Sequence, residues 1–390
     1  MSTTRKQLEL QSDRIEMVLA NHKAPGRITG GIVTPRVVQF HLAPAAGTRI
    51  RKVQSLAEEL ALALGVANVR VVYNAVSKRG GLQCLQLEIP RQDAQPVKLL
   101  PLMARLAQDK SSLSLRSMPL GTAVLGMCDD GAPLLLRLPS PDVAHVLISG
   151  TTGSGKTALC QTMILSLAMS HRRSQLQFVL VDPKRRAFAP FASLPHLMKP
   201  IASDAMEAGD ALDELVRLME ARGQRSNVAG ERDAQHAERV EPRVVVVLDE
   251  LADLMQMAGK ALADPLTRLV QRGREAGIHV IACTQKPSSQ VIGTLIRANF
   301  PVRLVGRVVS PEDARVAAGI GGTRAERLAG RGDFLAVAAG QVIRFQTAYV
   351  SAAEMEQVIA QFGSAPRRWD VFRGRPSLLH QAASVLAGAN

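Results

Sequence analysis

Aromatic side chains are scarce in this chain of 390 residues, in which Trp, Tyr and Phe together make up 3%. Proteins that hold single-stranded nucleic acid by stacking its bases need such side chains, so the composition argues against a stacking platform. The sequence also lacks any apolar run near the roughly 18 residues that cross a bilayer, and residues 1–14 lack the apolar region of a signal peptide. We therefore expect a cytoplasmic protein with no membrane insertion of its own.

Cysteine and acidic residues are also in short supply. The four cysteines are scattered without a C-x-x-C spacing, so neither a zinc site nor a disulfide framework is predicted, and buried thiols in a reducing cytoplasm fit better. Lys and Arg number 48 against 34 Asp and Glu, a net charge of +14. Such an excess attracts nucleic acid or an anionic membrane surface. Because stacking is disfavoured, contact with backbone phosphates is the expected mode of nucleic-acid binding.

A phosphate-binding pattern is the most informative feature that is present. Residues 150–157 read GTTGSGKT and match G-x-x-x-x-G-K-[ST]. The glycines let backbone N–H groups turn toward phosphate oxygens, the lysine neutralises the outer phosphates, and the last hydroxyl can ligate Mg²⁺. A predicted strand at 144–148 and a predicted helix at 158–168 flank the loop, as this motif requires, and they disfavour an ordinary Gly-rich surface loop. The predicted nucleotide-binding residues are Gly150, Thr151, Thr152, Gly153, Ser154, Gly155, Lys156 and Thr157, with Thr157 also on the metal.

The surrounding pattern predicts an α/β fold. Between residues 117 and 363, apolar strand candidates alternate with amphipathic helices, which indicates a mostly parallel sheet covered by helices. The predicted strands are 146–150, 177–182, 244–249, 279–284, 302–306 and 333–338, and the polar stretch 224–242 is predicted to be an exposed loop. Before this domain, 26–95 reads as a small α+β domain, with strands at 32–42, 69–73 and 82–89 and a helix at 53–64. The remaining parts are a helical segment at 1–25, a linker at 96–116 and a basic tail at 364–390.

Two acids follow the most apolar of these strands. Residues 243–250 read RVVVVLDE, so Asp249 and Glu250 emerge at the carboxyl end of a strand buried on both faces, where ligands bind in open α/β sheets. Asp249 would hold Mg²⁺ and Glu250 would polarise the attacking water. The alternative, that both acids only cap the next helix, is disfavoured because the same sequence also contains the phosphate loop.

Weaker signals stand at other strand ends. Gln285 follows the strand 279–284 and could sense the γ-phosphate, although a Thr-Gln pair is also ordinary turn chemistry. Asp182 closes another strand and either assists the site or caps a turn. Arg272 and Arg274 follow the Asp249 strand; a solvated basic face is the default interpretation, but in a ring of ATPases such an arginine can reach a neighbour's γ-phosphate.

Taken together, these motifs resemble the FtsK/SpoIIIE family of hexameric DNA translocases. Successive segments look like family signatures in the family's order: HVLISGTTGSGKT, FVLVDPKRRAFAPFASLPHLMKPIASD, VVVVLDELADLMQMAGK, RGREAGIHVIACTQKPSSQVIGTLIRANFPVRL and VSPEDARV. Residues 26–95 resemble the family's α domain and residues 100–363 its RecA-like β domain. The resemblance implies an ATP-driven pump for double-stranded DNA that works as a ring, with ATP and Mg²⁺ as cofactors.

The resemblance also implies roles for individual residues. Lys156 and Thr157 would bind phosphate and Mg²⁺, Asp249 and Glu250 metal and water, and Gln285 the γ-phosphate. Arg274, which stands just before the segment AGIH, would act on the neighbouring subunit's site. The residues implied to contact DNA are Lys286, Arg297 and Arg315. Pro311 stands where many members have Lys, so one channel contact is expected to be missing.

The resemblance leaves two features of typical members unmatched: N-terminal membrane spans and a C-terminal winged-helix domain that reads orienting sequences. We therefore expect movement on DNA without that directional cue and a localisation that depends on another protein or on the tail; a role in chromosome, plasmid, phage or mobile-element transfer would fit. Two other functions are weighed: a protein-export ATPase of the type VII secretion kind, which the α domain and the basic charge disfavour, and a non-hydrolysing adaptor, which the intact Lys156, Asp249 and Glu250 disfavour.

Overall fold

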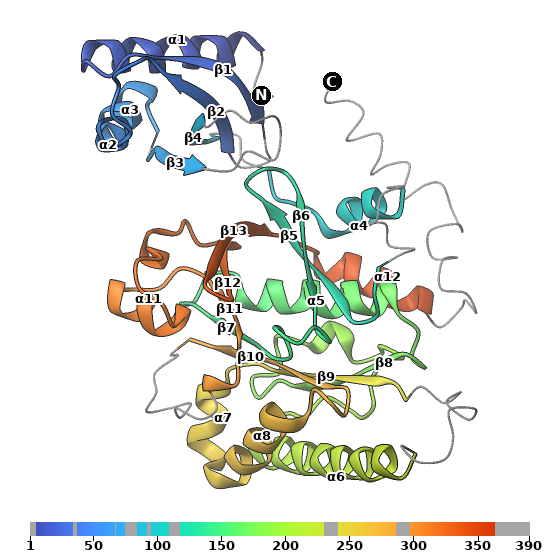
Figure 1. Cartoon of the computed structure of the whole chain (residues 1–390). Coiled ribbons are helices and arrows are strands. Elements are labelled where there is room, and N and C mark those ends of the chain that lie inside the picture. Colours follow the sequence, from blue (N-terminus) through green and yellow to red (C-terminus); the bar gives the residue numbers. More distant parts are fainter. Residues whose placement is uncertain are drawn as a thin grey trace. The chain divides into compact units, whose positions relative to one another are not determined.

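The computed structural model describes residues 5–33, 37–66, 68–74, 84–91, 95–108, 118–229, 241–285 and 297–362. The chain divides mainly between Val97 and Lys98 into two compact units, with residues 129–132 grouped with the first (Figure 1). The predicted tail at 364–390 lies outside the described residues. In the ranges that the structure describes, no helix has the length and apolar character needed to span a membrane.

The first unit is a four-stranded antiparallel sheet with three helices. Its strands follow the order β1-β2-β4-β3, and Ile15 and Leu19 of the first helix share one buried cluster with Phe40, Leu42 and Leu85 from the sheet. The first helix therefore belongs to the core of this unit. The elements are α1 (Arg5–Asn21), β1 (Gly26–Val33), β2 (Val37–Pro44), α2 (Ile50–Ser55), α3 (Ala57–Leu64), β3 (Arg70–Asn74) and β4 (Cys84–Pro90).

Two of the sequence predictions for this unit are corrected in detail. The segment 32–42 is divided between β1 and β2, which pair antiparallel from Gly26 opposite Pro44 to Val33 opposite Val38. The predicted helix at 53–64 is two helices, α2 and α3, which meet at Leu56. Apolar residues at helical spacing do not show such a break, because both helices bury the same side of the segment against one core.

The second unit contains a nine-stranded sheet in the order β6-β5-β13-β12-β11-β7-β10-β9-β8. The α/β fold predicted from the sequence is confirmed. Every strand predicted for this domain is present, and β5, β6 and β13 are additional. The strands are β5 (Thr122–Cys128), β6 (Pro133–Arg137), β7 (Val146–Ser149), β8 (Leu176–Val181), β9 (Arg243–Leu248), β10 (Ile278–Thr284), β11 (Val302–Val305), β12 (Asp333–Ala338) and β13 (Gln341–Thr347).

The sheet has a parallel half and an antiparallel half. Strands β11, β7, β10, β9 and β8 run parallel to one another, whereas β12, β13, β5 and β6 continue the sheet antiparallel. The sequence did not indicate β5, partly because a register shift between Val124 and Gly126 interrupts its alternation. Only glycine fits there, since a Cβ on Gly126 would lie 1.9 Å from the carbonyl oxygen of Gln346.

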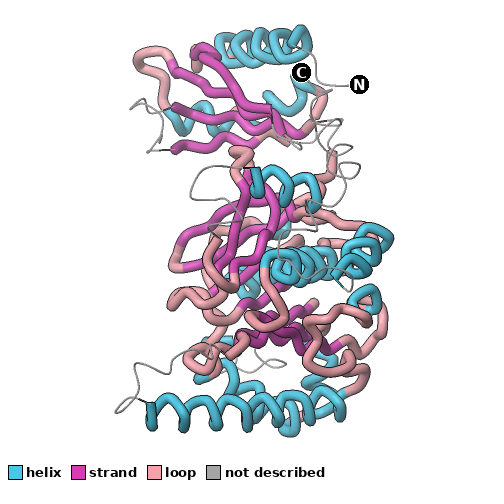
Figure 2. Tube along the Cα trace, turned by 90° about the vertical axis from the view of Figure 1, so that its right-hand side faces the viewer, coloured by secondary structure: helices cyan, strands magenta, loops and turns pink. Residues whose placement is uncertain are grey.

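Helices cover both faces of the parallel half. In Figure 1, α5 lies on one side of β8, β9 and β10, and α6, α7 and α8 lie on the other; Figure 2 shows the same layers from the side. Helix α6 extends through Ala229, past the start of the loop predicted at 224–242, because QRSNVA contains neither Gly nor Pro to stop it. The helices are α4 (Leu99–Gln108), α5 (Lys156–Ser170), α6 (Ala205–Ala229), α7 (Leu251–Ala258), α8 (Lys260–Arg272), α11 (Pro311–Ala318) and α12 (Ala352–Phe362), with the short helices η1 (Ala189–Phe191) and η2 (Ala325–Arg327).

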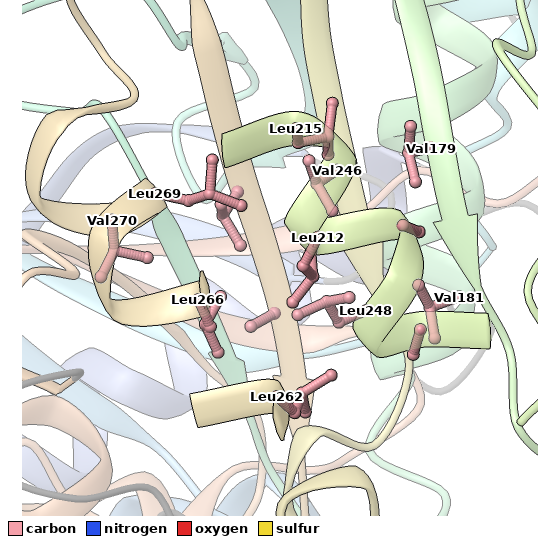
Figure 3. Close-up of a cluster of buried hydrophobic side chains, with 14 of the residues drawn as sticks. Val179, Val181, Leu212, Leu215, Val246, Leu248, Leu262, Leu266, Leu269 and Val270 are labelled. Carbon is pink, nitrogen blue, oxygen red and sulfur yellow. The ribbon is translucent and has the colours of Figure 1, made fainter. Parts of the chain in front are cut away.

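The alternation of side chains along β9 fixes which face each residue meets. Val246 and Leu248 pack against Leu212 and Leu215 of α6 and against α8 (Figure 3). Burial of each such side chain contributes roughly 1.5–3 kcal/mol. Because successive side chains of a strand point to opposite faces, the position after Leu248 belongs to the α5 side of the sheet. This places Asp249 beside the helix that begins with Lys156.

Candidate nucleotide-binding site

The predicted phosphate loop connects β7 to α5, and α5 begins at Lys156. Gly153 and Gly155 have φ angles of +78° and +106°, in the left-handed region that side chains other than glycine rarely adopt. The loop is therefore shaped as the motif predicts, with backbone N–H groups and a helix N-terminus facing a common space. Its last polar residue, Thr157, is exposed at the start of the helix.

Two neighbouring loops hold the phosphate loop by its backbone. The Thr151 N–H donates to the Arg307 carbonyl at 2.8 Å, and the Gly332 N–H donates to the Ser154 carbonyl at 2.7 Å. A Cβ on Gly155 would lie 2.7 Å from the Gly332 nitrogen, so the two loops touch without side chains between them. The sequence analysis missed this support; the glycines that flank Arg331 were the available signal for a close backbone approach.

Lys156 is buried inside the loop. Its Nζ donates to the carbonyls of Gly150 and Thr151 at 2.7 and 3.2 Å. Burial lowers the pKa of Lys156 from its ordinary value, and the negative charges of Glu250 and Asp249 act in the opposite direction. The ammonium group thus lies within the field of both predicted acids, which the sequence separates from it by more than ninety positions.

Glu250 does not cap the helix that follows it. It precedes α7 in a left-handed conformation, with φ 55°, and its side chain makes no capping hydrogen bond. The Oε1 atom instead accepts the Gln285 N–H at 3.0 Å. A non-glycine residue in this backbone region costs of order 1 kcal/mol and persists when surrounding contacts fix it. The strain and the contact together direct the carboxylate toward the end of β10.

Asp249 lies at the end of β9. Its N–H donates to the Val181 carbonyl at 2.9 Å, and burial, followed by the charges of Asp182 and Glu250, raises its pKa to about 6. A hard cation that prefers oxygen ligands fits this set of carboxylates and the Thr157 hydroxyl. Within the described ranges, no three acidic, His or Cys side chains are arranged to hold a metal by themselves. Water and nucleotide oxygens would have to complete the coordination.

Gln285 connects the phosphate loop with the acids. Its side-chain Oε1 accepts the Thr152 hydroxyl at 3.1 Å, while its backbone N–H donates to Glu250. The end of β10 itself is also attached to the phosphate loop, since the Gly150 N–H donates to the Thr284 carbonyl at 3.3 Å. The structure therefore brings together Thr152, Glu250 and Gln285, which come from three separate sequence motifs.

The two candidate arginines lie far from this constellation. Arg272 is the last residue of α8, and Arg274 follows in the turn before β10, where its Nη1 donates to the Pro141 carbonyl at 3.3 Å. Both side chains are exposed. The seven residues of β10 span about 20 Å, and the phosphate loop is attached to the opposite end of that strand. Arg274 is thus placed at the wrong edge of the sheet to serve the site of its own chain.

The residues implied to contact DNA divide into two groups. Lys286 lies outside the described residues. Arg297 and Arg315 are described. Arg303 lies close to the segments of both, since its Nη2 donates to the Arg297 carbonyl at 3.3 Å and its Nη1 would lie 2.2 Å from a Cβ on Gly319, which follows α11. Arg303 is a basic residue that the sequence analysis missed. Pro311 occupies the first turn of α11 behind the N-cap Ser310, a position that suits proline.

Comparison with known proteins covers both units. The model of the "FtsK/SpoIIIE family" matches residues 108–240 and 226–289, and that of the "FtsK alpha domain" matches residues 1–91. DNA translocase SftA of Bacillus subtilis is 33% identical over 92% of this chain and 37% of its own length. DNA translocase FtsK 2 of Ralstonia nicotianae is 33% identical over 92% of this chain and 48% of its own. The chain thus spans less than half the length of these relatives.

Solved structures share the fold. The pCW3 conjugation coupling protein TcpA, determined with ATPγS, has a TM-score of 0.59 at 17% identity, over 91% of this chain and all of that one. The cytoplasmic domain of the type VII secretion ATPase EccC of Thermomonospora curvata has a TM-score of 0.58 at 23% identity, over 70% of this chain and 35% of that one. At these identities the likeness establishes a P-loop ATPase fold for the second unit.

Proposed function

Because this chain belongs to the FtsK/SpoIIIE family, we propose that it is an ATPase that moves double-stranded DNA. One observation carries the proposal: the hydrogen bonds from Thr152 to Gln285 and from Gln285 to Glu250 join the phosphate loop to the predicted water-activating acid. A loop that bound phosphate for another purpose would not require this connection. The relatives named DNA translocases support DNA as the substrate.

Each residue of the site has a proposed role. Lys156 and the loop N–H groups bind the phosphates, and Asp249 and Thr157 hold the metal. Bound Mg²⁺ would neutralise charge on the β- and γ-phosphates. Glu250 accepts a proton from the attacking water, and its hydrogen bond with the Gln285 N–H keeps the carboxylate oriented for that step. Gln285 also senses the γ-phosphate in this proposal, because its side chain contacts the phosphate loop and its backbone N–H contacts Glu250.

Arg274 completes the site of a neighbouring subunit in this proposal. Its position at the amino end of β10 supports action in trans, because about 20 Å of strand separates it from its own phosphate loop. An assembly in which each subunit places this edge against the next one's loop is head-to-tail and becomes a ring when the rotation between subunits closes, and we propose the hexameric ring implied by the family resemblance. We also propose that this ring works in the cytoplasm.

DNA would be held by its backbone phosphates, without reading of base sequence. Arg315 is exposed and makes one long ion pair with Glu312, at 3.7 Å, so its charge remains accessible. Arg297 and Arg303 supply further positive charge near the end of α11. Lys286 completes the proposed set. The domain division also remains a proposal: an α domain at 26–95, whose core also contains side chains of α1, and the motor at 117–363.

The test is hydrolysis of ATP measured with duplex DNA, with an export-signal peptide and with neither. We expect duplex DNA to stimulate hydrolysis and Lys156→Ala to abolish the stimulation; Lys260→Ala, on the exposed start of α8, is the matched control. If the peptide stimulates and DNA does not, the protein-export function is correct. If nucleotide binds but neither addition leads to hydrolysis, the adaptor function is correct. Imaging of the protein on linear duplex DNA with a slowly hydrolysed ATP analogue tests the ring.

A further inference from the structure

Asp182 stands beside Asp249 at the edge of the sheet. Strands β8 and β9 are parallel, with Val181 opposite Leu248, so Asp182 and Asp249 continue the pairing by one residue. Side chains at paired positions of neighbouring strands point to the same face. Asp182 therefore lies on the α5 side of the sheet with Asp249, where its negative charge is the second contributor, after burial, to the raised pKa of Asp249.

One carboxylate oxygen of Asp182 has a clear structural use and the other has none. The Oδ2 atom accepts the Phe188 N–H at 2.9 Å, which holds the chain after the strand. The Oδ1 atom is buried and has no hydrogen-bond partner among the described residues, in a side chain that is 1% exposed. A buried carboxylate oxygen without a partner costs free energy. A merely structural turn cap would not leave this oxygen without a partner in a residue that neighbours a second acid.

The nearby lysine does not neutralise Asp182. The Nζ of Lys184 forms an ion pair with Asp253 on α7 at 2.8 Å. This pair ties the segment after β8 to the helix that follows Glu250, and so it fixes the two strand ends relative to each other. Two neighbouring carboxylates held in this way have a natural partner in a cation or in the water bound to one.

We propose that Asp182 is a positioning residue of the metal site, which acts with Asp249 by accepting a hydrogen bond from water on the nucleotide-bound Mg²⁺. The inference rests on the proposed function. Asp182 would act through water because Asp249 and Thr157 take the direct positions in the proposed site. Contact through water also suits Mg²⁺, which keeps several of its waters in protein sites. The chemistry recognised is thus a hydrated divalent cation bound with a triphosphate.

The experiment is a Mg²⁺ titration of the binding of a fluorescent, slowly hydrolysed ATP analogue to the full chain. Asp182→Asn keeps an oxygen that accepts the Phe188 N–H but removes the charge. Loss of such an outer-shell partner typically weakens metal affinity 10-fold to 100-fold, so the half-saturating Mg²⁺ concentration should rise about 10-fold. Analogue binding in EDTA should stay unchanged. Asp264→Asn, on the exposed side of α8, removes the same charge elsewhere and should match the parent.

The possible outcomes separate the two proposals. If the parent chain does not bind the analogue with Mg²⁺, the proposed function itself fails. If the parent binds and Asp182→Asn shows the same Mg²⁺ dependence, Asp182 is a structural acid and the inference is wrong. Asp182→Ser, whose hydroxyl can also accept the Phe188 N–H, serves if the Asn variant unfolds, and it should show the same shift in Mg²⁺ dependence. Thermal unfolding in EDTA checks that each variant is folded.

Discussion

The two ends of the parallel strands have opposite chemistry. At the carboxyl ends lie the phosphate loop, the acids Asp249 and Glu250, and a backbone held in strained, glycine-rich conformations. At the amino ends lie Arg243 and Arg274 with two buried histidines, His145 and His279. The first edge can bind a metal and a triphosphate, and Arg307 and Arg331, which are placed there, contact the phosphate loop through their backbone. The second edge carries Arg274, and the phosphate loop lies at the opposite end of the strands.

This difference explains how a single subunit can hold a residue that a nucleotide site needs at a place from which its own site is out of reach. A parallel sheet directs all carboxyl ends to one side, so the residues that bind a ligand gather there. A residue fixed to the amino ends cannot reach that ligand within the same chain. The proposed role of Arg274 then needs a second copy of the chain. Mixing subunits that each carry a substitution at only one of the two edges tests this role.

The largest effect is expected from Arg274 and Lys156 in mixed assemblies. Arg274→Ala alone and Lys156→Ala alone should each lower ATPase activity about a thousandfold, the range known for a missing arginine finger. In an equal mixture, about a quarter of the interfaces would pair an intact Lys156 with an intact Arg274, so activity should recover toward about a quarter of the parent rate. ATP hydrolysis by the mixed and unmixed proteins is the measurement.

The control for this experiment is Arg272→Ala, an exposed arginine two positions away, which should leave activity near the parent level. A mixture that stays as inactive as its components would show that Arg274 does not act across subunits. The difference between the two sheet edges would then have no bearing on catalysis.

A smaller effect distinguishes two glycines of the phosphate loop. An added Cβ at Gly155 meets the Gly332 backbone at 2.7 Å, whereas at Gly153 nothing lies within 4 Å. Both have positive φ angles, which cost an alanine about 1 kcal/mol. Gly155→Ala should therefore lower the free energy of unfolding by about 3 kcal/mol and Gly153→Ala by about 1 kcal/mol. Urea denaturation measures both, and equal losses would show that the antiparallel half does not hold the loop.

The two edges should also respond oppositely to acid. Burial lowers the pKa of His145 to about 3, with the charge of His279 as a further cause, and burial lowers the pKa of His279 to about 4, with the charges of Arg243 and Arg274 as further causes. Burial and neighbouring acids raise the pKa of Asp249 to about 6. As pH falls below about 6.5, the unfolded histidines bind protons that the folded ones cannot, so the histidines lower stability. Asp249 binds a proton at a higher pH in the folded protein than in the unfolded chain, so its protonation raises the free energy of unfolding.

From pH 7.5 to pH 5, each histidine should reduce the free energy of unfolding by about 2 kcal/mol, and Asp249 should increase it by about 1 kcal/mol. His279→Asn keeps a donor for the Ala144 carbonyl, which the His279 Nδ1 contacts at 3.0 Å, and should lose about 2 kcal/mol less than the parent. Asp249→Asn should lose about 1 kcal/mol more. Urea denaturation at both pH values measures the free energy of unfolding of the parent and the two variants. Identical losses in all three proteins would show that the two edges do not respond differently to acid.

The smallest effect concerns DNA, for which Arg315 on α11 is one of the proposed contacts. Arg315→Ala removes one phosphate contact, so the slope of log affinity against log salt should fall by about 1 unit while sequence preference stays absent. Fluorescence anisotropy with duplex DNA at several salt concentrations measures the slope. Arg268→Ala, at an arginine paired with Glu220, should leave it unchanged, and an unchanged slope for Arg315→Ala would remove this residue from the DNA surface.

The sequence was sufficient for the parallel half of the sheet. All five parallel strands, together with the antiparallel β12, were predicted because buried strands are continuous apolar runs, such as VVVV before Asp249. Gly150 to Thr157 identified the phosphate loop because the motif depends on local backbone geometry, which nearby residues specify. The antiparallel strands β5, β6 and β13 were missed because a bulge and half-exposed positions weaken their alternation.

Tertiary structure alone decided which distant residues meet. Nothing local in the sequence tells that Gly332 supports Gly155, that the Gln285 N–H binds Glu250, or that Asp182 stands beside Asp249, because each contact depends on strand order and register. The same holds for Arg274, whose distance from the phosphate loop follows from the length and direction of β10. Local patterns determine the parts of this protein, while the pairing of strands far apart in the chain determines how those parts form a site.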